Sequence, residues 1–206
     1  KKPVAFIEDC AVSLDHLADY TAQLKEIFKK YNTSGMFYAH ASVGTLHVRP
    51  VLNMKSDEDI KNMRSISEES FEIVKNYKGS HSGEHGDGIV RSEFHEMMFG
   101  KKIVNAFEEI KDTFDSKNLL NPGKIVRPFK SNDRDLMRYK LGYQAQNIST
   151  HYDWSNWGQF TDAVEMCNNN GACRKLDSGV MCPSYRVTKE EKDLVRGRAN
   201  TLRLAL

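Results

Sequence analysis

Two long amphipathic segments separated by two short apolar runs constrain the fold of this chain most strongly. Apolar residues recur at intervals of three and four over 14–31 and 60–77, the spacing of one helix face. Residues 3–11, 35–41 and 44–53 are predicted strands, the last two meeting at Val43 and Gly44. Further helices are expected at about 91–98 and 101–115. This order predicts an α+β fold with an antiparallel sheet and helices on one face.

Local signals set the expected helix ends. Ser13 and Ser56 are predicted N-caps, with Asp59 supporting the second, and Thr188 with Glu191 resembles a capping box. The helix over 101–115 is expected to turn one apolar face inward, formed by Ile103, Phe107, Ile110 and Phe114.

A change of composition near residue 127 predicts two domains. Residues 1–128 form the first, incomplete at its start, and the polar, weakly periodic stretch 129–149 is a linker. Residues 150–206 form a smaller, mostly helical unit, with helices near 159–166 and from Thr188. The chain begins without Met and stops inside an amphipathic pattern, so both ends are expected to be cut from a longer polypeptide.

Composition excludes several classes of protein. The 206 residues carry 30 Lys and Arg against 28 Asp and Glu, a balance that gives no reason to expect a nucleic-acid partner. No apolar run approaches the length of a membrane span. Three of the four cysteines crowd together, unlike a secreted disulfide framework, which indicates a reducing compartment and a metal role.

Two histidines and a glycine-rich loop form the first candidate site. His40 and His47 lie on adjacent predicted strands, and Glu84 and His85 lie in the loop 79–88. Two imidazoles and one carboxylate suit Zn²⁺, Fe²⁺ or Mn²⁺, and His85 is a candidate general base. The alternative is that these are ordinary core or surface residues. The other histidines, His16, His81, His95 and His151, are expected to be structural, and Asp87 to be a turn residue.

The cysteine segment forms the second candidate site. Cys167, Cys173 and Cys182, the last followed by Pro, suit an iron–sulfur cluster better than a zinc ion, because one zinc ligand is missing. Asn170 stands where a ferredoxin-type run has its second cysteine, and the last gap is stretched to eight residues. Because the Cys-Pro of such a run commonly ligates the neighbouring cluster, a partner motif beyond residue 206 would be needed. The alternative is a set of structural thiols. Cys10 is expected to be a small buried hydrophobe.

Three motifs, HASVGTLHVRP (40–50), SGEHGDGIVRSEF (82–94) and FDSKNLLNPGKIV (114–126), resemble the C-terminal domain of the FAD-linked oxidases. That family includes D-lactate, glycolate and D-2-hydroxyglutarate dehydrogenases. The cysteine segment, with CPSYRVTKEEKDLVRGRANTLRLAL (182–206), is similar to the iron–sulfur domain fused behind the oxidase in very long bacterial members.

The resemblance implies oxidation of a D-2-hydroxy acid, D-lactate or D-2-hydroxyglutarate, by FAD. Electrons would then pass through iron–sulfur centres, expected to be 4Fe-4S, to a quinone or an electron-transfer protein. By motif, His40, His47 and Glu84 correspond to ligands of a divalent metal, usually zinc, and His85 to the base. The family's FAD-binding domain would lie upstream, so this chain alone is expected to be inactive.

Other residues follow from the same resemblance. Asn121 and Lys124, in the NPGK signature, would lie near the flavin. Arg49 replaces an Asn found near the substrate in relatives; it could pair with a substrate carboxylate, or be an ordinary exposed strand residue. The segment between the two histidines also departs from the family's Gly-Asp-Gly-Asn pattern.

Two other classes of function stay open at this point. One is a metal-dependent hydrolase that uses the histidines and Glu84, and the other is a non-catalytic iron–sulfur or docking module. The expected location is the cytoplasm, with peripheral attachment to the inner face of the membrane as an alternative. The sequence is also compatible with a homo-oligomer. The identity of the hydroxy acid, the metal and the electron acceptor is not fixed by the sequence.

Overall fold

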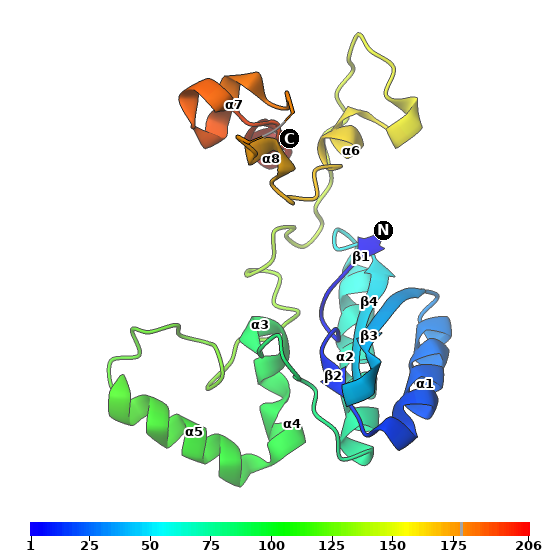
Figure 1. Cartoon of the computed structure of the whole chain (residues 1–206), viewed down its shortest axis with the longest axis vertical. Helices are drawn as coiled ribbons and strands as arrows, with labels where there is room; N and C mark the ends of the chain where they lie inside the picture. Colours follow the sequence, from blue (N-terminus) through cyan, green and yellow to red (C-terminus); the bar gives the residue numbers. More distant parts are fainter. Residues whose placement is uncertain (178) are drawn as a thin grey trace. The chain divides into compact units, whose positions relative to one another are not determined.

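The computed structural model describes residues 1–177 and 179–206. They form two compact units, Lys1–Tyr143 and Gln144–Leu206, coloured blue to green and yellow to red in Figure 1. The division falls within the predicted linker 129–149. Each unit is described by itself.

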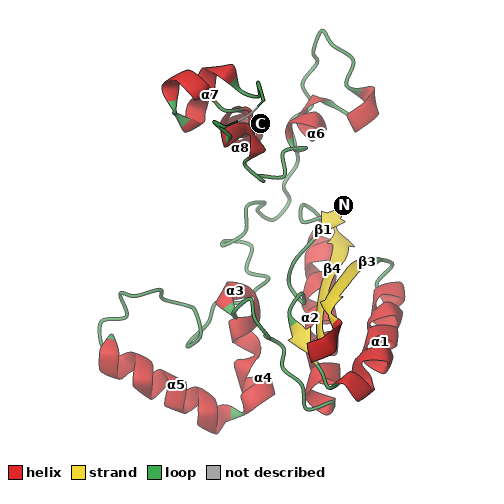
Figure 2. Cartoon of the chain, in the orientation of Figure 1, coloured by secondary structure: helices red, strands yellow, loops and turns green. Residues whose placement is uncertain are grey.

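A four-stranded antiparallel sheet forms the centre of the first unit, which confirms the predicted α+β class. Its longest strand, β4 (Thr45–Leu52), pairs along one edge with β3 (Gly35–His40). Two short strands, β1 (Lys2–Pro3) and β2 (Cys10–Ala11), share the other edge of β4. Figure 2 shows this small sheet beside the two long helices of the unit.

The prediction of one continuous strand over residues 3–11 is therefore wrong for the middle of that segment. The chain pairs with β4 at both ends of that segment but leaves it between residues 4 and 9. Phe6 and Ile7 are buried in the core there, and the Asp9 side chain accepts hydrogen bonds from another loop. Core packing and side-chain hydrogen bonds replace the missing strand pairs.

Helices α1 (Leu17–Lys30) and α2 (Asp57–Asn76) pack against each other and supply most of the apolar core. The Ser56 hydroxyl accepts a hydrogen bond from Asp59 N–H, which confirms that cap. Ser13 makes no side-chain cap; a 3-10 turn, Leu14–His16, precedes α1 instead. Buried side chains from both helices meet β4 in one cluster, including Tyr20, Leu24, Phe28, Met63, Ile66, Phe71, Leu46 and Val48.

The hairpin of β3 and β4 sorts its side chains onto two faces. Leu46 and Val48 point into the core, so His47 between them faces the other side of the sheet. The register pairs Tyr38 with His47 and His40 with Thr45, which puts both histidines on that same face. A 3-10 turn, Ala41–Val43, and Gly44 connect the strands. Gly44 has φ of 72°, and a Cβ there would lie 1.9 Å from the Val12 carbonyl oxygen.

Four helical segments follow the glycine-rich loop: α3 (Gly88–Arg91), a 3-10 turn (Ser92–Phe94), α4 (His95–Phe99) and α5 (Lys101–Phe114). The prediction that α5 turns its apolar face inward is wrong for this chain. None of its residues is buried, and Ile103, Ile110 and Phe114 are exposed. The helical spacing is correct, but the described part of the chain covers this apolar side only at Phe107, which packs against His95 and Phe99.

The second unit consists of short helices joined by loops. They are α6 (Phe160–Val164), α7 (Pro183–Thr188), α8 (Val195–Ala205) and 3-10 turns at Ser155–Trp157, Ala172–Arg174 and Glu191–Asp193. The predicted capping box is wrong, because Thr188 ends α7. Cys173, Cys182, Tyr185 and Leu194 form a small core. Among the described residues, no helix combines the length and apolar character needed to cross a membrane.

Candidate active site

The glycine-rich loop is held against the end of the sheet by backbone pairing. Ala11 and Ser80 exchange both backbone hydrogen bonds, and Gly83 N–H donates to the Asp9 carbonyl. Because β2 also pairs with β4 at Leu46, the loop is brought beside the strand that carries His47. Three distant segments of the chain therefore meet at this point.

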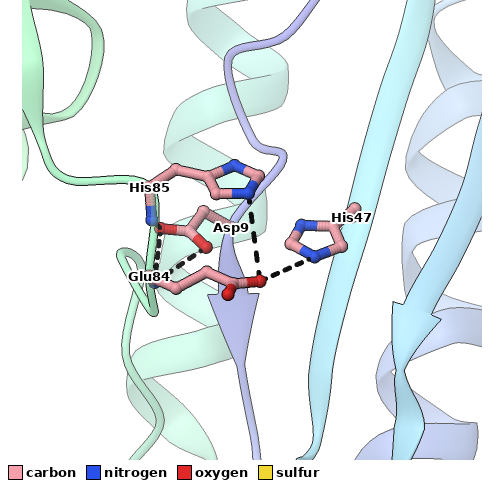
Figure 3. A group of neighbouring side chains, drawn as sticks. All are labelled: Asp9, His47, Glu84 and His85. Carbon is pink, nitrogen blue, oxygen red and sulfur yellow. Dashed lines mark hydrogen bonds and ion pairs between the residues drawn. The ribbon is translucent and has the colours of Figure 1, made fainter.

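Two imidazoles converge on one carboxylate oxygen of this loop. Glu84 Oε1 lies 3.1 Å from His40 Nε2 and 3.0 Å from His47 Nε2. His85 Nε2 lies 3.9 Å from the same oxygen, and its ring stacks on His47 at 4.6 Å with an interplanar angle of 6°. Figure 3 shows His47, Glu84 and His85 pointing toward one another. The structure thus brings together all four residues that the sequence singled out here.

The protonation pattern of His47 fits a cation between these groups. Its Nδ1 lies 2.6 Å from the Glu8 carbonyl oxygen, which can only accept, so Nδ1 carries the proton. The neutral ring then turns the Nε2 lone pair toward a carboxylate oxygen 3.0 Å away. Two such atoms repel unless a second proton or a metal ion lies between them. The separation suits two ligands of one ion with bonds of about 2.0–2.2 Å.

Asp9 fixes the loop that carries Glu84 and His85. Its fully buried carboxylate accepts hydrogen bonds from the backbone N–H of Glu84 at 3.0 Å and of His85 at 2.8 Å. Burial raises the pKa of Asp9, but these N–H groups and the charge of Arg91 outweigh it and hold the pKa below its usual value. The ionised carboxylate is therefore a stable part of the site.

Glu8 connects the remaining side chains of the site. Its carboxylate lies 3.4 Å from His85 Nδ1 and accepts a hydrogen bond from Arg49 Nε at 2.8 Å. Arg49 also donates to the Tyr38 hydroxyl at 2.9 Å and lies on the same face of the hairpin as His47. A carboxylate beside Nδ1 favours the ring form of His85 in which Nε2 is free to accept a proton.

The sequence prediction missed Glu8 and Asp9. The available signal was a pair of acidic residues at the end of an apolar run, where a buried strand would place neither.

The exposure of the side chains increases across the site. The side chain of His47 is 1% exposed, that of Glu84 48% and that of His40 61%. A small anionic ligand could therefore reach the rim while His47 stays shielded from water.

Asn121 and Lys124 lie away from the sheet, on the segment that follows α5. Both line a mostly apolar hollow of about 590 Å³, together with Gly88, Phe107, Ile110 and Phe114. The carboxylate of Asp115 shapes this segment by accepting hydrogen bonds from Leu119 and Leu120 N–H. Gly88 belongs to the loop that carries Glu84, so the hollow and the histidine site share one segment.

The cysteines of the second unit are not gathered at ligand distance. Within the described residues, no three cysteine, histidine or acidic ligand atoms of this unit lie close enough together to hold one ion. Cys182 Sγ accepts a hydrogen bond from Val195 N–H, and Cys167 is partly exposed. Cys167 and Cys173 line a hollow of about 620 Å³, with Arg196 and Arg198 also in its wall. Thiol and cationic side chains in one hollow suit an anionic iron–sulfur cluster.

Comparison with known proteins defines the class. Residues 1–125 match the family described as FAD linked oxidases, C-terminal domain. The chain belongs to this family.

Particular relatives extend the match into the second unit. The chain is 36% identical over 203 residues to a D-2-hydroxyglutarate dehydrogenase of Pseudomonas putida and 33% identical over 203 residues to one of Escherichia coli. Both alignments cover 98% of this chain and 20% of the relative. A D-lactate dehydrogenase of Archaeoglobus fulgidus is 30% identical over 127 residues, which cover 62% of this chain and 28% of the relative. The chain thus spans about a fifth of the length of the D-2-hydroxyglutarate dehydrogenases it matches.

Proposed function

We propose that this chain is the substrate- and metal-binding part of a flavin-dependent D-2-hydroxy acid dehydrogenase, and that the acid is D-2-hydroxyglutarate. The convergence of His40 and His47 on Glu84 Oε1 carries the proposal. The choice of acid is supported by the extent of the matches. Relatives named for D-2-hydroxyglutarate align with 98% of the chain, whereas those named for D-lactate align with 60–62% of it.

In this proposal His40, His47 and Glu84 hold a divalent metal, zinc or manganese. The ion would supply positive charge that binds the carboxylate and hydroxyl oxygens of the substrate and lowers the pKa of the hydroxyl. His47 is the rigid ligand, because its ring is buried and its Nδ1–H is fixed by the Glu8 carbonyl. His40 and Glu84 are the exposed ligands at the rim, where substrate enters.

His85 is the proposed general base. Its Nε2 faces the ligand set, and Glu8 beside Nδ1 would stabilise the imidazolium that forms when the ring takes the hydroxyl proton. FAD, held mainly by a domain outside this chain, would accept the hydride. Asn121 and Lys124 are proposed to contact it from the hollow beside α5.

Arg49 is proposed to bind a carboxylate of the substrate. It lies two residues beyond His47 on the same face, and the Tyr38 hydroxyl and Glu8 hold its guanidinium in place. A dicarboxylate such as D-2-hydroxyglutarate offers a second carboxylate for this contact once the first is bound at the metal.

The second unit is proposed to carry electrons away from the flavin through an iron–sulfur cluster, expected to be 4Fe-4S. Cys167, Cys173 and Cys182 would be ligands, with others supplied from outside this chain. The hollow beside Cys167 and Cys173 supports this role. The acceptor would be a quinone or an electron-transfer protein.

Metal content and turnover together test the proposal. In the holoenzyme, His47→Ala should remove one equivalent of zinc or manganese, the one held with His40 and Glu84, and abolish oxidation of D-2-hydroxyglutarate. His85→Ala should keep the metal and still lose turnover, because only the base is gone. His151→Ala, an exposed histidine of the second unit, is the matched control and should change neither. Unchanged metal content in His47→Ala, or turnover retained in His85→Ala, would overturn the assignment.

A further inference from the structure

A second cluster of histidines and a carboxylate lies at the other end of the glycine-rich loop. His81, Asp87 and His95 offer ligand atoms that all lie within 4.8 Å of one another. Asp87 Oδ2 is 3.3 Å from His95 Nε2, and Asp87 Oδ1 is 3.9 Å from His81 Nε2. None of these three residues belongs to the site described above.

Both imidazoles are buried and lack hydrogen-bond partners where they face Asp87. The side chain of His81 is 0% exposed and that of His95 3%. Neither nitrogen of His81 makes a hydrogen bond, and neither does Nε2 of His95. Leaving buried polar atoms unpaired costs about 1–3 kcal/mol each, so an arrangement of this kind calls for a ligand.

The ring form of His95 points to the same conclusion. Its Nδ1 lies 3.1 Å from the Ile125 carbonyl oxygen, an acceptor only, so Nδ1 carries the proton. In the neutral form of the ring, the Nε2 lone pair then faces a carboxylate oxygen 3.3 Å away. This repeats the pattern of His47, in which a backbone carbonyl holds one nitrogen and leaves the other ready to bind a cation.

The surroundings favour a bound cation. Phe71 and Phe99 pack edge-on against the His81 ring, so water is excluded and attraction to Asp87 is strengthened. Burial lowers the pKa of His81 to about 4, which keeps its ring neutral and able to ligate. A cationic group that opposes a bound cation is Arg91, whose guanidinium donates to the Gly86 carbonyl and lies 3.9 Å from the Asp9 carboxylate. Asp9 thereby balances much of that charge.

We propose that His81, Asp87 and His95 bind a second divalent metal ion, with zinc the best match to two imidazoles and one carboxylate. Tetrahedral zinc separates its ligand atoms by about 3.3 Å, the distance between Asp87 Oδ2 and His95 Nε2. His81 Nε2, 3.9 Å from Asp87 Oδ1, would have to move closer to complete the set. Asp87 is the one partly exposed member, with 24% of its side chain accessible, so water can complete the coordination there.

The role of this ion would be to hold the active-site loop. His81 lies three residues before Glu84, Asp87 lies two residues after His85, and His95 begins helix α4. An ion bound by all three would tie both ends of the loop to α4 and limit its movement. It is a positioning site, since none of its ligands reaches the proposed substrate.

Zinc stoichiometry tests the proposal independently of the proposed function. The purified protein is stripped with a chelator, equilibrated by dialysis against a Zn²⁺ buffer and measured by elemental analysis. The wild-type protein should bind about two equivalents, and His95→Gln and Asp87→Asn about one each. His47→Ala should also bind about one, and the His47→Ala/Asp87→Asn double variant none.

Asp87→Asn guards against misfolding, because it nearly preserves shape at a partly exposed position, and circular dichroism checks the fold. His16→Gln is the matched control, since His16 stacks on Tyr77 outside both clusters and should leave two equivalents. Equal zinc in the wild type and in a folded Asp87→Asn variant would overturn the second site. So would a single wild-type equivalent that His47→Ala removes. Failure of the first site would instead appear as loss at Asp87→Asn with none at His47→Ala.

Discussion

The histidine site of the first unit and the cysteine segment of the second differ in how far this chain alone prepares them. Glu84 lies within 3.1 Å of two imidazole nitrogens, and hydrogen bonds to Asp9 and Glu8 fix the groups around it. The three cysteines do not come together as ligands: Cys167 is partly exposed, and Cys173 and Cys182 are packed in a small core with Tyr185 and Leu194.

The difference follows from the scaffold under each site. A sheet edge and its paired loop determine the positions of His47 and Glu84 before any metal binds. In the second unit the cysteines lie on short helices and loops, around a core of four buried residues. The first site is preorganised by this chain, whereas the second would need its cluster and ligands from outside the chain to order it.

Thiol alkylation should show the largest contrast between the units. Burial raises the pKa of Cys10 to about 12 from an ordinary 9.0, so its thiolate fraction at pH 8 falls about a thousandfold. Iodoacetamide should therefore modify the partly exposed Cys167 quickly in the native protein and leave Cys10 intact, as read by peptide mass spectrometry. Denaturant should remove the difference. Equal native rates at the two thiols would contradict the burial of Cys10.

Truncating the small core should unfold the cysteine segment and spare the histidine site. Leu194 is fully buried beside Cys173 and Cys182, so Leu194→Ala should destabilise the second unit by about 3 kcal/mol. Hydrogen exchange should rise over 160–206 and stay unchanged in β4 and α2. Leu204→Ala, at an exposed position of the helix α8 that follows Leu194, is the control. Increased exchange in both units would show that they depend on one another.

Removing the charge of Asp9 should make the histidine site less preorganised, and in that respect more like the cysteine segment. Asp9→Asn deprives one of two buried amides of its acceptor, which should lower the free energy of unfolding by about 2 kcal/mol and weaken zinc binding. Urea unfolding and zinc titration measure the two effects. Asp19→Asn, an exposed residue of α1, should change neither. Unaltered zinc affinity would mean that the loop does not need this anchor.

The smallest expected effect is a loss of folding stability at low pH. A hydrogen bond from Lys111, with those from Leu120 and Leu119 N–H, lowers the pKa of Asp115 to about 2 from an ordinary 3.8. A lowered pKa stabilises the folded state above pH 3.8, and this contribution disappears as the pH falls toward 2. An NMR titration of the carboxyl carbon should give the midpoint near 2. A midpoint near 3.8 would show that Asp115 does not hold the segment of Asn121 and Lys124.

Features determined by neighbours in sequence were predictable. The spacing of apolar residues located α1 and α2, Ser56 and Asp59 marked a helix start, and alternation within 44–53 identified β4. The prediction that Thr188 begins a helix was wrong, although its hydroxyl does accept a nearby backbone hydrogen bond. The donor is Glu190 N–H, and the bond lies in the turn after α7. A capping pattern alone does not show that a helix follows it.

Features that depend on distant contacts were not predictable from the pattern. Asp9 hydrogen-bonds residues 75 and 76 positions away, and the apolar face of α5 is left exposed by the described chain. The sequence around His81 and His95 offers no sign of a site, because their approach to Asp87 depends on how the loop and α4 fold together. The motifs identified which residues belong to the candidate site, but only the fold shows what holds them in place.

The turn at Gly44 has a consequence for how this site can evolve. The strand register and the close approach of Gly44 to Val12 fix the seven-residue interval from His40 to His47. A shift of β3 against β4 by one residue would turn one imidazole to the opposite face of the sheet and break the pair. Descendants of this sequence therefore have to keep the register of β3 against β4 if His40 and His47 are to stay together beside Glu84.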